Sequence, residues 1–351
     1  MMKYAILNKA LLGMVLLLLV SSIVVVSATT TTEDETTETE TTTEDETTTS
    51  INDDDSNDRE VTVMTTSTHA EIESKLESGG TEDSFKIEVD VGVNGVEFKI
   101  AFEAETATNE TEREFEVDFS QLVEFIDENS NGVYDDSVDT DVQTLELNSF
   151  EPIAYTTENI SGITVHVFDV STTDGIFGAR IYATGDFTNI NGSLIAPTQV
   201  KIDVFIHDFN FTDVDSQLAL KVELSSELET SFNDQTEDEE DGRATDEAAV
   251  DILMTDTNGF FSWKESAEID GIAHQVNSSI HEVSATEQEI YLNYPQGSEI
   301  VHDPKIGFEN LLIMGGNPLP IADFIADNLL PISIGLAIVV IGLVVVAKRR
   351  S

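Results

Sequence analysis

Apolar and polar residues alternate along much of the chain from Val61 onward. Successive side chains of a β-strand point to opposite faces, so a period of two predicts strands that bury one face. The clearest pattern flanks Asn94-Gly95, with Phe85, Ile87, Val89, Val91 and Val93 before it and Val96, Phe98, Ile100 and Phe102 after it. Asn-Gly is typical of a two-residue hairpin turn, so we expect Val93 to pair with Val96 and Val91 with Phe98.

Many more short strands are predicted, separated by Gly, Pro, Asn and Asp at short intervals. They cover residues 115–119, 122–126, 142–147, 163–170, 177–183, 200–206, 218–224, 250–254, 260–263, 289–294 and 306–313. No helical period is sustained among them, so the sequence predicts an all-β fold, an antiparallel sandwich ectodomain that is either one large unit or two in tandem. Residues 227–248 are acidic and poor in apolar side chains. They are expected to be a surface insertion or the joint between β-rich regions 61–226 and 249–314.

Residues 329–347 form an uncharged apolar run directly followed by Lys348, Arg349 and Arg350. As a helix this run would be roughly 28 Å long, close to the thickness of the hydrocarbon core of a bilayer. The run therefore predicts a C-terminal transmembrane helix, although a buried helix of a soluble core is an alternative. Because positive charge next to a span favours the cytoplasmic side, residues 348–351 are the expected cytoplasmic tail, and 315–328 are the expected tether.

The N-terminus fits the same orientation. Residues 1–28 contain Lys3 and Lys9, then an apolar stretch and small residues that end at Ala28, which predicts a cleaved signal peptide. An uncleaved first span is the alternative. Residues 29–60 are rich in Thr, Glu and Asp and have almost nothing to bury, so we expect a disordered stalk. This layout resembles single-pass cell-surface proteins of archaea and bacteria, which implies a cell-membrane location with the ectodomain outside.

The charge of the chain restricts its partners. It has 16 Lys and Arg, 69 Asp and Glu and a net charge of −53, and five of the basic residues lie in the two terminal segments. An exported part this acidic repels nucleic acid and attracts cations and basic partners. Solubility in a salty medium explains the same composition. The absence of cysteine excludes disulfides, thiolate metal sites and cysteine nucleophiles.

One loop has the spacing of a calcium site. Oxygen-bearing residues occupy its positions one, three, five and nine, with glycine at six and a backbone carbonyl at seven, and these are Asp127, Asn129, Asn131, Asp135, Gly132 and Val133. Calcium takes six to eight oxygen ligands, which a tight loop can offer when alternate residues point inward. The loop resembles those of EF-hands and dockerins, which implies bound calcium. Val138 replaces the usual acid at position twelve, so Asp136 or Asp139 is the expected substitute. An Asn/Asp-rich turn without metal is the alternative.

The remaining candidate sites are less specific. Glycosylation sequons begin at Asn109, Asn159, Asn191, Asn210 and Asn277. The histidines His166, His207, His274, His281 and His302 are scattered, and Trp263 beside Phe260 and Phe261 is either a sugar platform or core. No nucleophile elbow, zinc motif or nucleotide loop is present, so no enzyme is expected.

These observations predict a membrane-anchored extracellular β-domain protein of the cell surface, stabilised by calcium, that serves in adhesion, envelope structure or the binding of a protein or glycan partner. The alternative is a surface-anchored protein that binds a cation or a carbohydrate. An extracellular hydrolase that uses paired carboxylates is a third and less favoured hypothesis.

Overall fold

The computed structural model describes the backbone of residues 47–51, 60–78, 81–106, 109–226, 231–236, 246–253, 258–308, 312–314 and 317–319. All of them belong to the unit that spans residues 44–351. Within these residues, no helix is long and apolar enough to cross a membrane. The predicted signal peptide, transmembrane helix and cytoplasmic tail lie outside the described residues, as does most of the predicted stalk.

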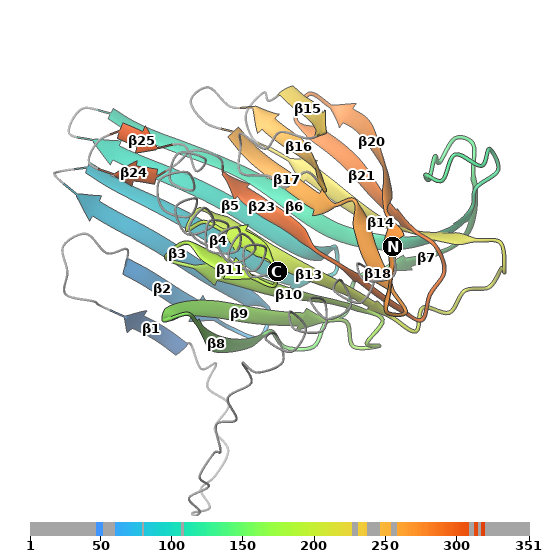
Figure 1. Ribbon diagram of the computed structural model, residues 1–351, viewed down its shortest axis with the longest axis horizontal. Helices are drawn as coiled ribbons and strands as arrows, with labels where there is room; N and C mark the ends of the chain where they lie inside the picture. Colours follow the sequence, from blue (N-terminus) through green and yellow to red (C-terminus); the bar gives the residue numbers. More distant parts are fainter. Residues whose placement is uncertain are drawn as a thin grey trace, which may run out of the picture. The chain divides into compact units, whose positions relative to one another are not determined.

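The prediction of an all-β fold with antiparallel sheets is confirmed (Figure 1). Among the described residues, the first sheet has ten strands in the order β1-β2-β3-β4-β5-β6-β14-β21-β20, and β7 also pairs with β6. Their bounds are β1 Thr47–Ile51, β2 Glu60–Thr65, β3 His69–Ser78, β4 Thr81–Gly92, β5 Gly95–Thr106, β6 Asn109–Ile126, β7 Thr140–Glu146, β14 Gln217–Ser225, β20 Asn277–Ser284 and β21 Glu287–Tyr294.

The second sheet has the order β15-β16-β17-β23-β13-β10-β9-β8, and β22 pairs with β13 and joins β18 and β19 to it. Their bounds are β8 Ala154–Ile160, β9 Ile163–Ser171, β10 Phe177–Thr184, β13 Gln199–His207, β15 Ser231–Thr236, β16 Glu247–Leu253, β17 Asn258–Lys264, β18 Ser266–Ile269, β19 Ile272–Gln275, β22 Glu299–His302 and β23 Pro304–Phe308. Two short hairpins complete the described strands: β11 Thr188–Ile190 with β12 Ser193–Ile195, and β24 Leu312–Met314 with β25 Asn317–Leu319.

The two sheets pack face to face around one apolar core. Phe119 of the first sheet lies 6.2 Å from Phe177 and 6.3 Å from Phe261 of the second, measured between ring centroids. Phe115 and Phe308 make a similar contact at 5.3 Å. These edge-on ring contacts cross from sheet to sheet, and most of the buried apolar residues of the two sheets belong to one cluster between them. The arrangement is a β-sandwich.

Strands from before and after residues 227–248 share both sheets. In the first sheet β14 pairs with β21, and in the second sheet β13 pairs with β23. Each of the two large sheets is therefore built from both parts of the sequence.

The register expected for the 85–102 hairpin is wrong by two residues. Val91 pairs with Val96 and Val89 with Phe98, so the turn is made by Val93 and Asn94. Gly95 lies within the strand at a φ of +130°, and a Cβ built on it would lie 2.2 Å from the carbonyl oxygen of Phe119. The glycine is therefore needed where β5 approaches β6, and the predicted apolar face survives because a shift of two residues preserves alternation.

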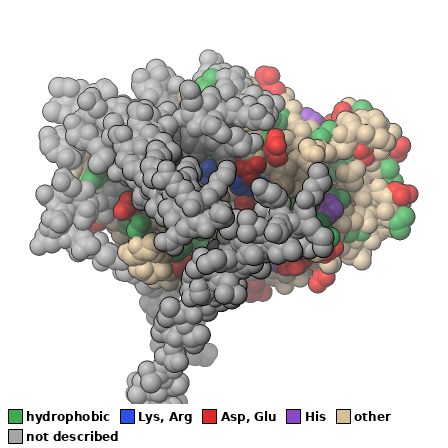
Figure 2. All heavy atoms as spheres, viewed as in Figure 1, with side chains coloured by type: hydrophobic (Ala, Val, Ile, Leu, Met, Phe, Trp, Pro, Cys, Tyr) green, Lys and Arg blue, Asp and Glu red, His purple; other side chains and the backbone are tan. Residues whose placement is uncertain are grey.

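The outer face of the first sheet carries acidic residues directly opposite each other on neighbouring strands. One row, which we call the carboxylate row, runs in register through Asp90, Glu97, Asp118, Glu223 and Glu289, with His69 and His281 at its ends. Lys221 contacts Glu223 and Glu289, each at 2.8 Å. Figure 2 shows acidic side chains over the described part of one face of the molecule. Like charges placed opposite each other destabilise a sheet, and both Lys221 and dissolved salt reduce that repulsion along the row.

Candidate functional site

The predicted calcium loop connects β6 to β7, and its side-chain oxygens turn inward. The carboxylate of Asp127 accepts hydrogen bonds from the amides of Asn131 at 3.2 Å and Gly132 at 2.7 Å. The side-chain oxygen of Asn129 accepts from the amide of Asn131 at 2.9 Å, and that of Asn131 accepts from the amide of Val133 at 3.0 Å. Gly132 has a φ of +77°, a conformation that suits glycine. The oxygens at positions one, three and five are thus brought to one side of a tight turn.

Of the two acids expected to substitute for Val138, Asp139 is turned toward the backbone of the loop. Its two carboxylate oxygens accept hydrogen bonds from the amide of Glu128 at 3.1 Å and the amide of Asp135 at 2.8 Å. From position thirteen, the side chain therefore ties the start of the loop, at Glu128, to its middle, at Asp135, whereas the side chain of Asp136 is exposed. Within the described part of the chain, no group of three or more His, Cys, Asp and Glu is placed to hold a metal.

The middle of the loop folds back over the outer face of the first sheet. Tyr134 is only 4 % exposed, and its ring centroid lies 5.2 Å from that of Phe125 and 4.9 Å from that of Tyr291. With Val123 and Ala219 these rings form a second apolar cluster, separate from the core between the sheets. The loop is therefore held by a buried aromatic side chain as well as by its own hydrogen bonds.

Three polar residues of β20 and β21 fix the backbone of the docked loop, and we call them the clamp. Asn293, 2 % exposed, accepts a hydrogen bond from the amide of Tyr134 at 2.9 Å. Ser279 donates to the carbonyl of Tyr134 at 2.8 Å, and Asn277 donates to the carbonyl of Gly132 at 3.1 Å. The amide group of Asn293 donates in turn to the carbonyls of Asn277 and Tyr291. Because these groups are buried or half-buried, each lost bond would leave a costly unpaired partner.

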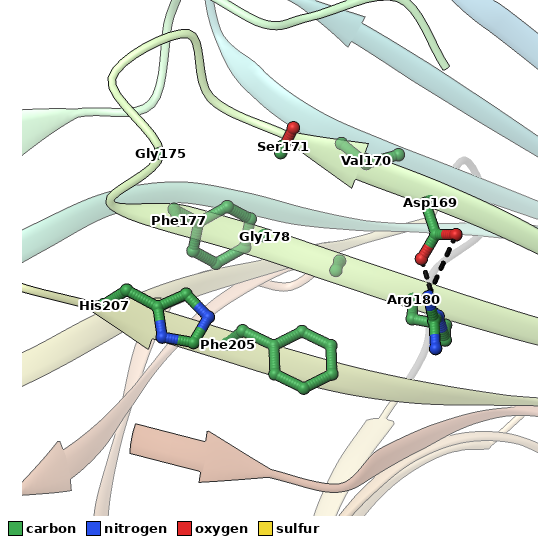
Figure 3. A pocket seen from close by; sticks show the side chains of 10 residues that line it. Asp169, Val170, Ser171, Gly175, Phe177, Gly178, Arg180, Phe205 and His207 are labelled. Atoms are coloured by element: carbon green, nitrogen blue, oxygen red, sulfur yellow. Dashed lines mark hydrogen bonds and ion pairs between the residues drawn. The ribbon is translucent and has the colours of Figure 1, made fainter. Parts of the chain in front are cut away.

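A groove of about 390 Å³ lies on the outer face of the second sheet, over β9, β10 and β13 (Figure 3). Gly178 lies at its centre, between Ser171 of β9 and Phe205 of β13. The rings of Phe205 and His207 are stacked along one side, with centroids 6.0 Å apart and planes 12° apart.

At one end of the groove, Asp169 accepts two hydrogen bonds from the guanidinium of Arg180, at 2.6 and 3.2 Å. Aromatic surface beside a few fixed polar groups is typical of small-ligand sites. Among the residues that line the groove, Asp169 is the only carboxylate, so the groove does not present the carboxylate pair that a glycoside hydrolase requires.

The other sequence candidates are structural. Trp263 is 2 % exposed and packs on Phe261 in the core, so it forms no sugar platform. His302 is bonded to the hydroxyl of Tyr294 and the carbonyl of Lys264, and burial lowers its pKa to about 4. Burial also lowers the pKa of His166 to about 4. Both imidazoles are therefore neutral near neutral pH. Of the six histidines, only His207 lines the groove.

The sequons fall in different environments. Asn159, Asn191 and Asn210 are exposed, whereas Asn277 is half-buried beneath the loop. Asn109 lies in β6, and its side chain is outside the described ones.

Comparison with protein-family models and with curated proteins finds no match for this chain.

Sequence reasoning missed the clamp and the groove. Ligand spacing marks the loop itself, but Asn277 and Asn293 are 16 residues apart and resemble ordinary polar strand residues. The groove had one weak signal, a glycine at position 178 inside a predicted strand, because such a glycine often marks the close approach of another group.

Proposed function

We propose that this chain is a membrane-anchored extracellular protein of the cell surface whose β-sandwich is stabilised by calcium, and that it serves in adhesion, envelope structure or partner binding. The predicted signal peptide, the predicted span at 329–347 and the acidic composition support the location. The proposal assigns no catalytic step.

The observation that carries the proposal is the geometry of residues 127–139. Asp127, Asn129 and Asn131 turn their side-chain oxygens toward the backbone of the loop, and Asp139 ties its start at Glu128 to its middle at Asp135. Asp135 and the carbonyl of Val133 are the remaining expected ligands. Calcium prefers this mixture of carboxylate, amide and carbonyl oxygens. The docked position of Tyr134 holds the loop in one shape, which reduces the entropy that calcium binding must offset.

Thermal unfolding of the full chain in detergent, with calcium or with a chelator, tests the proposal. Free calcium at about 100 times Kd would stabilise the fold by about 2.7 kcal/mol, and Tm would rise by roughly 5–11 °C. The double variant Asp127→Ala and Asp135→Ala should lose this rise. The matched control, Glu151→Ala and Glu158→Ala, removes two exposed carboxylates elsewhere and should keep it. If the wild type had the same Tm with and without calcium, the proposal would be contradicted.

The groove favours carbohydrate binding as a second candidate function. The rings of Phe205 and His207 can bury the C–H face of a sugar, while Asp169 and Arg180 can accept from and donate to its hydroxyls. A neutral sugar fits best, because a chain of net charge −53 repels anions.

Calorimetric titration with neutral oligosaccharides tests this function, with Gly178→Val as the variant that fills the groove. The φ of Gly178 is not among the positive ones, and a Cβ there would lie 3.3 Å from the carbonyl oxygen of Val170. The variant should fold and lose binding. Gly92→Val is the control, because a Cβ at Gly92 has no neighbour within 4 Å. Equal binding by wild type and Gly178→Val would exclude the groove as the site.

A further inference from the structure

One glycosylation sequon is part of the clamp. Asn277-Ser278-Ser279 contains the two groups that define a sequon, the amide of the asparagine and the hydroxyl two residues later. Both groups are occupied by the loop. The amide nitrogen Nδ2 of Asn277 donates to the carbonyl of Gly132 at 3.1 Å, and the hydroxyl of Ser279 donates to the carbonyl of Tyr134 at 2.8 Å. The sequon also lies within β20, where all three of its residues pair with β21.

The loop crowds Asn277 on the side that faces Gly132. A Cβ built on Gly132 would lie 2.6 Å from Nδ2 of Asn277, so a carbon atom added on that side of the nitrogen has no space while the loop is docked. An N-linked glycan forms when Nδ2 bonds to the anomeric carbon of a lipid-diphosphate-linked sugar, with loss of one N–H proton and release of the lipid diphosphate. The new carbon would be bonded to the nitrogen that Gly132 covers.

We propose that a glycan on Asn277 and the docked loop exclude each other, so that the folded protein carries no glycan at this sequon. The other sequons with described side chains lack this conflict. Asn159 and Asn191 are exposed beside tight turns, where Ser161 and Asn191 itself have positive φ values. Asn210 is also exposed, and its described contact is a hydrogen bond from Gln143 to its backbone carbonyl. A glycan at any of these three positions displaces no described side-chain contact of the clamp.

The order of events decides which state forms. A glycan attached to Asn277 before folding would keep residues 132–134 off the sheet and expose the cluster that Tyr134 covers. A loop that docks first hides the sequon. The contacts that block Asn277 are made between groups of the protein itself, so this inference does not depend on calcium.

Glycopeptide mass spectrometry on the full chain from a host that glycosylates sequons tests the proposal directly. We expect a glycan on Asn159 and an unmodified Asn277 in the folded protein. The variant Tyr134→Ala, which removes the aromatic anchor of the loop, should raise the occupancy of Asn277. A folded wild-type protein with a glycan at Asn277 and slow hydrogen exchange at residues 131–134 would overturn the proposal.

A second measurement does not depend on the host. Asn277→Gln pushes the amide one carbon further into Gly132, whereas Asn159→Gln makes the same change at an exposed position. Hydrogen exchange at residues 131–134 should become roughly tenfold faster in Asn277→Gln, which corresponds to the loss of one buried hydrogen bond. It should stay unchanged in Asn159→Gln. Equal exchange in the two variants would show that the loop tolerates extra atoms at Asn277, and the proposal would fail.

Discussion

Glu124 of β6 is a buried carboxylate, 0 % exposed, that holds the segment from residue 208 to 216. One of its oxygens accepts hydrogen bonds from the amides of Thr212 and Asp213, at 2.8 and 3.0 Å, and from the hydroxyl of Ser216 at 2.6 Å. The other accepts from the hydroxyl of Thr212 at 3.1 Å and from the side chain of Gln143 at 2.7 Å. These donors replace the water that the carboxylate loses on burial.

The substitution Glu124→Gln keeps the shape of this side chain and removes its charge. One oxygen becomes an NH2 group that faces the amide nitrogen of Gln143, so two donors meet and at least one bond is lost. The bonds that remain fall from charge-assisted to neutral strength. We expect a loss of about 3 kcal/mol, between the values for one unsatisfied buried donor and for a broken buried ionic network. For a domain of this size, Tm should fall by about 6–12 °C.

Thermal unfolding of the full chain gives the global effect, and hydrogen exchange at residues 209–216 shows whether the damage begins there. Glu146→Gln on the neighbouring strand β7 is the matched control, because that side chain is exposed. A wild-type Tm for Glu124→Gln, with unchanged exchange at 209–216, would refute the role of this carboxylate.

The pH dependence of this site has a defined sign. Burial would raise the pKa of Glu124, but the hydrogen bonds from Ser216, Asp213 and Thr212 outweigh it and bring the pKa below its ordinary value of 4.5. The stabilisation is therefore present above about pH 4.5 and is lost as the pH falls through the lowered pKa. Glu124→Gln should remove this part of the acid sensitivity, which unfolding measured between about pH 3 and pH 6 would detect.

Three further predictions concern buried or half-buried positions. Burial, followed by the neighbouring carboxylates, raises the pKa of Asp118 from its ordinary 3.8 to about 7, so the folded state binds the proton more tightly. Stability should fall as pH rises through this window, and Tm measurements on Asp118→Asn should show that the fall is removed. Burial lowers the pKa of His302 to about 4, so an NMR titration should find its imidazole neutral down to that pH, and acidification below about 6.5 should cost stability because the unfolded chain binds the proton. Gly95→Ala places a Cβ 2.2 Å from the carbonyl oxygen of Phe119 and should destabilise the fold by roughly 2–4 kcal/mol in denaturant titrations, whereas Gly92→Ala has open space and should not.

The strands of the core could be predicted because each buries one face. Segment 200–206, for example, alternates in sequence and becomes β13, with Val200, Ile202, Val204 and Ile206 in the core. The edge strand β8 and the exposed β19 were not predicted, because most of their residues are exposed and show no alternation. Periodicity reports burial, so strands that bury little leave no signal.

The parts that escaped prediction depend on contacts between distant residues. The hairpin register depends on the close approach of Gly95 to Phe119, and Phe119 lies outside the hairpin. The oxygen spacing of loop 127–139 could be recognised from the local sequence, and the structure adds that Asp139 ties Glu128 to Asp135. The clamp could not be predicted from the sequence, because Asn277 carries the signature of a sequon and its partner Gly132 is 145 residues away. Local patterns cannot reveal such pairings.

The last strand of the second sheet in sequence order is an interior strand. β23 pairs with β13 on one side and with β17 on the other, and the amide of Phe308 also donates to the carbonyl of Thr198 at 3.0 Å. If the chain is anchored to a membrane by its carboxyl end, as proposed, tension from the membrane would enter the sandwich through this strand. Extraction would have to shear the hydrogen bonds on both of its sides, so resistance to pulling is concentrated in the middle of the sheet.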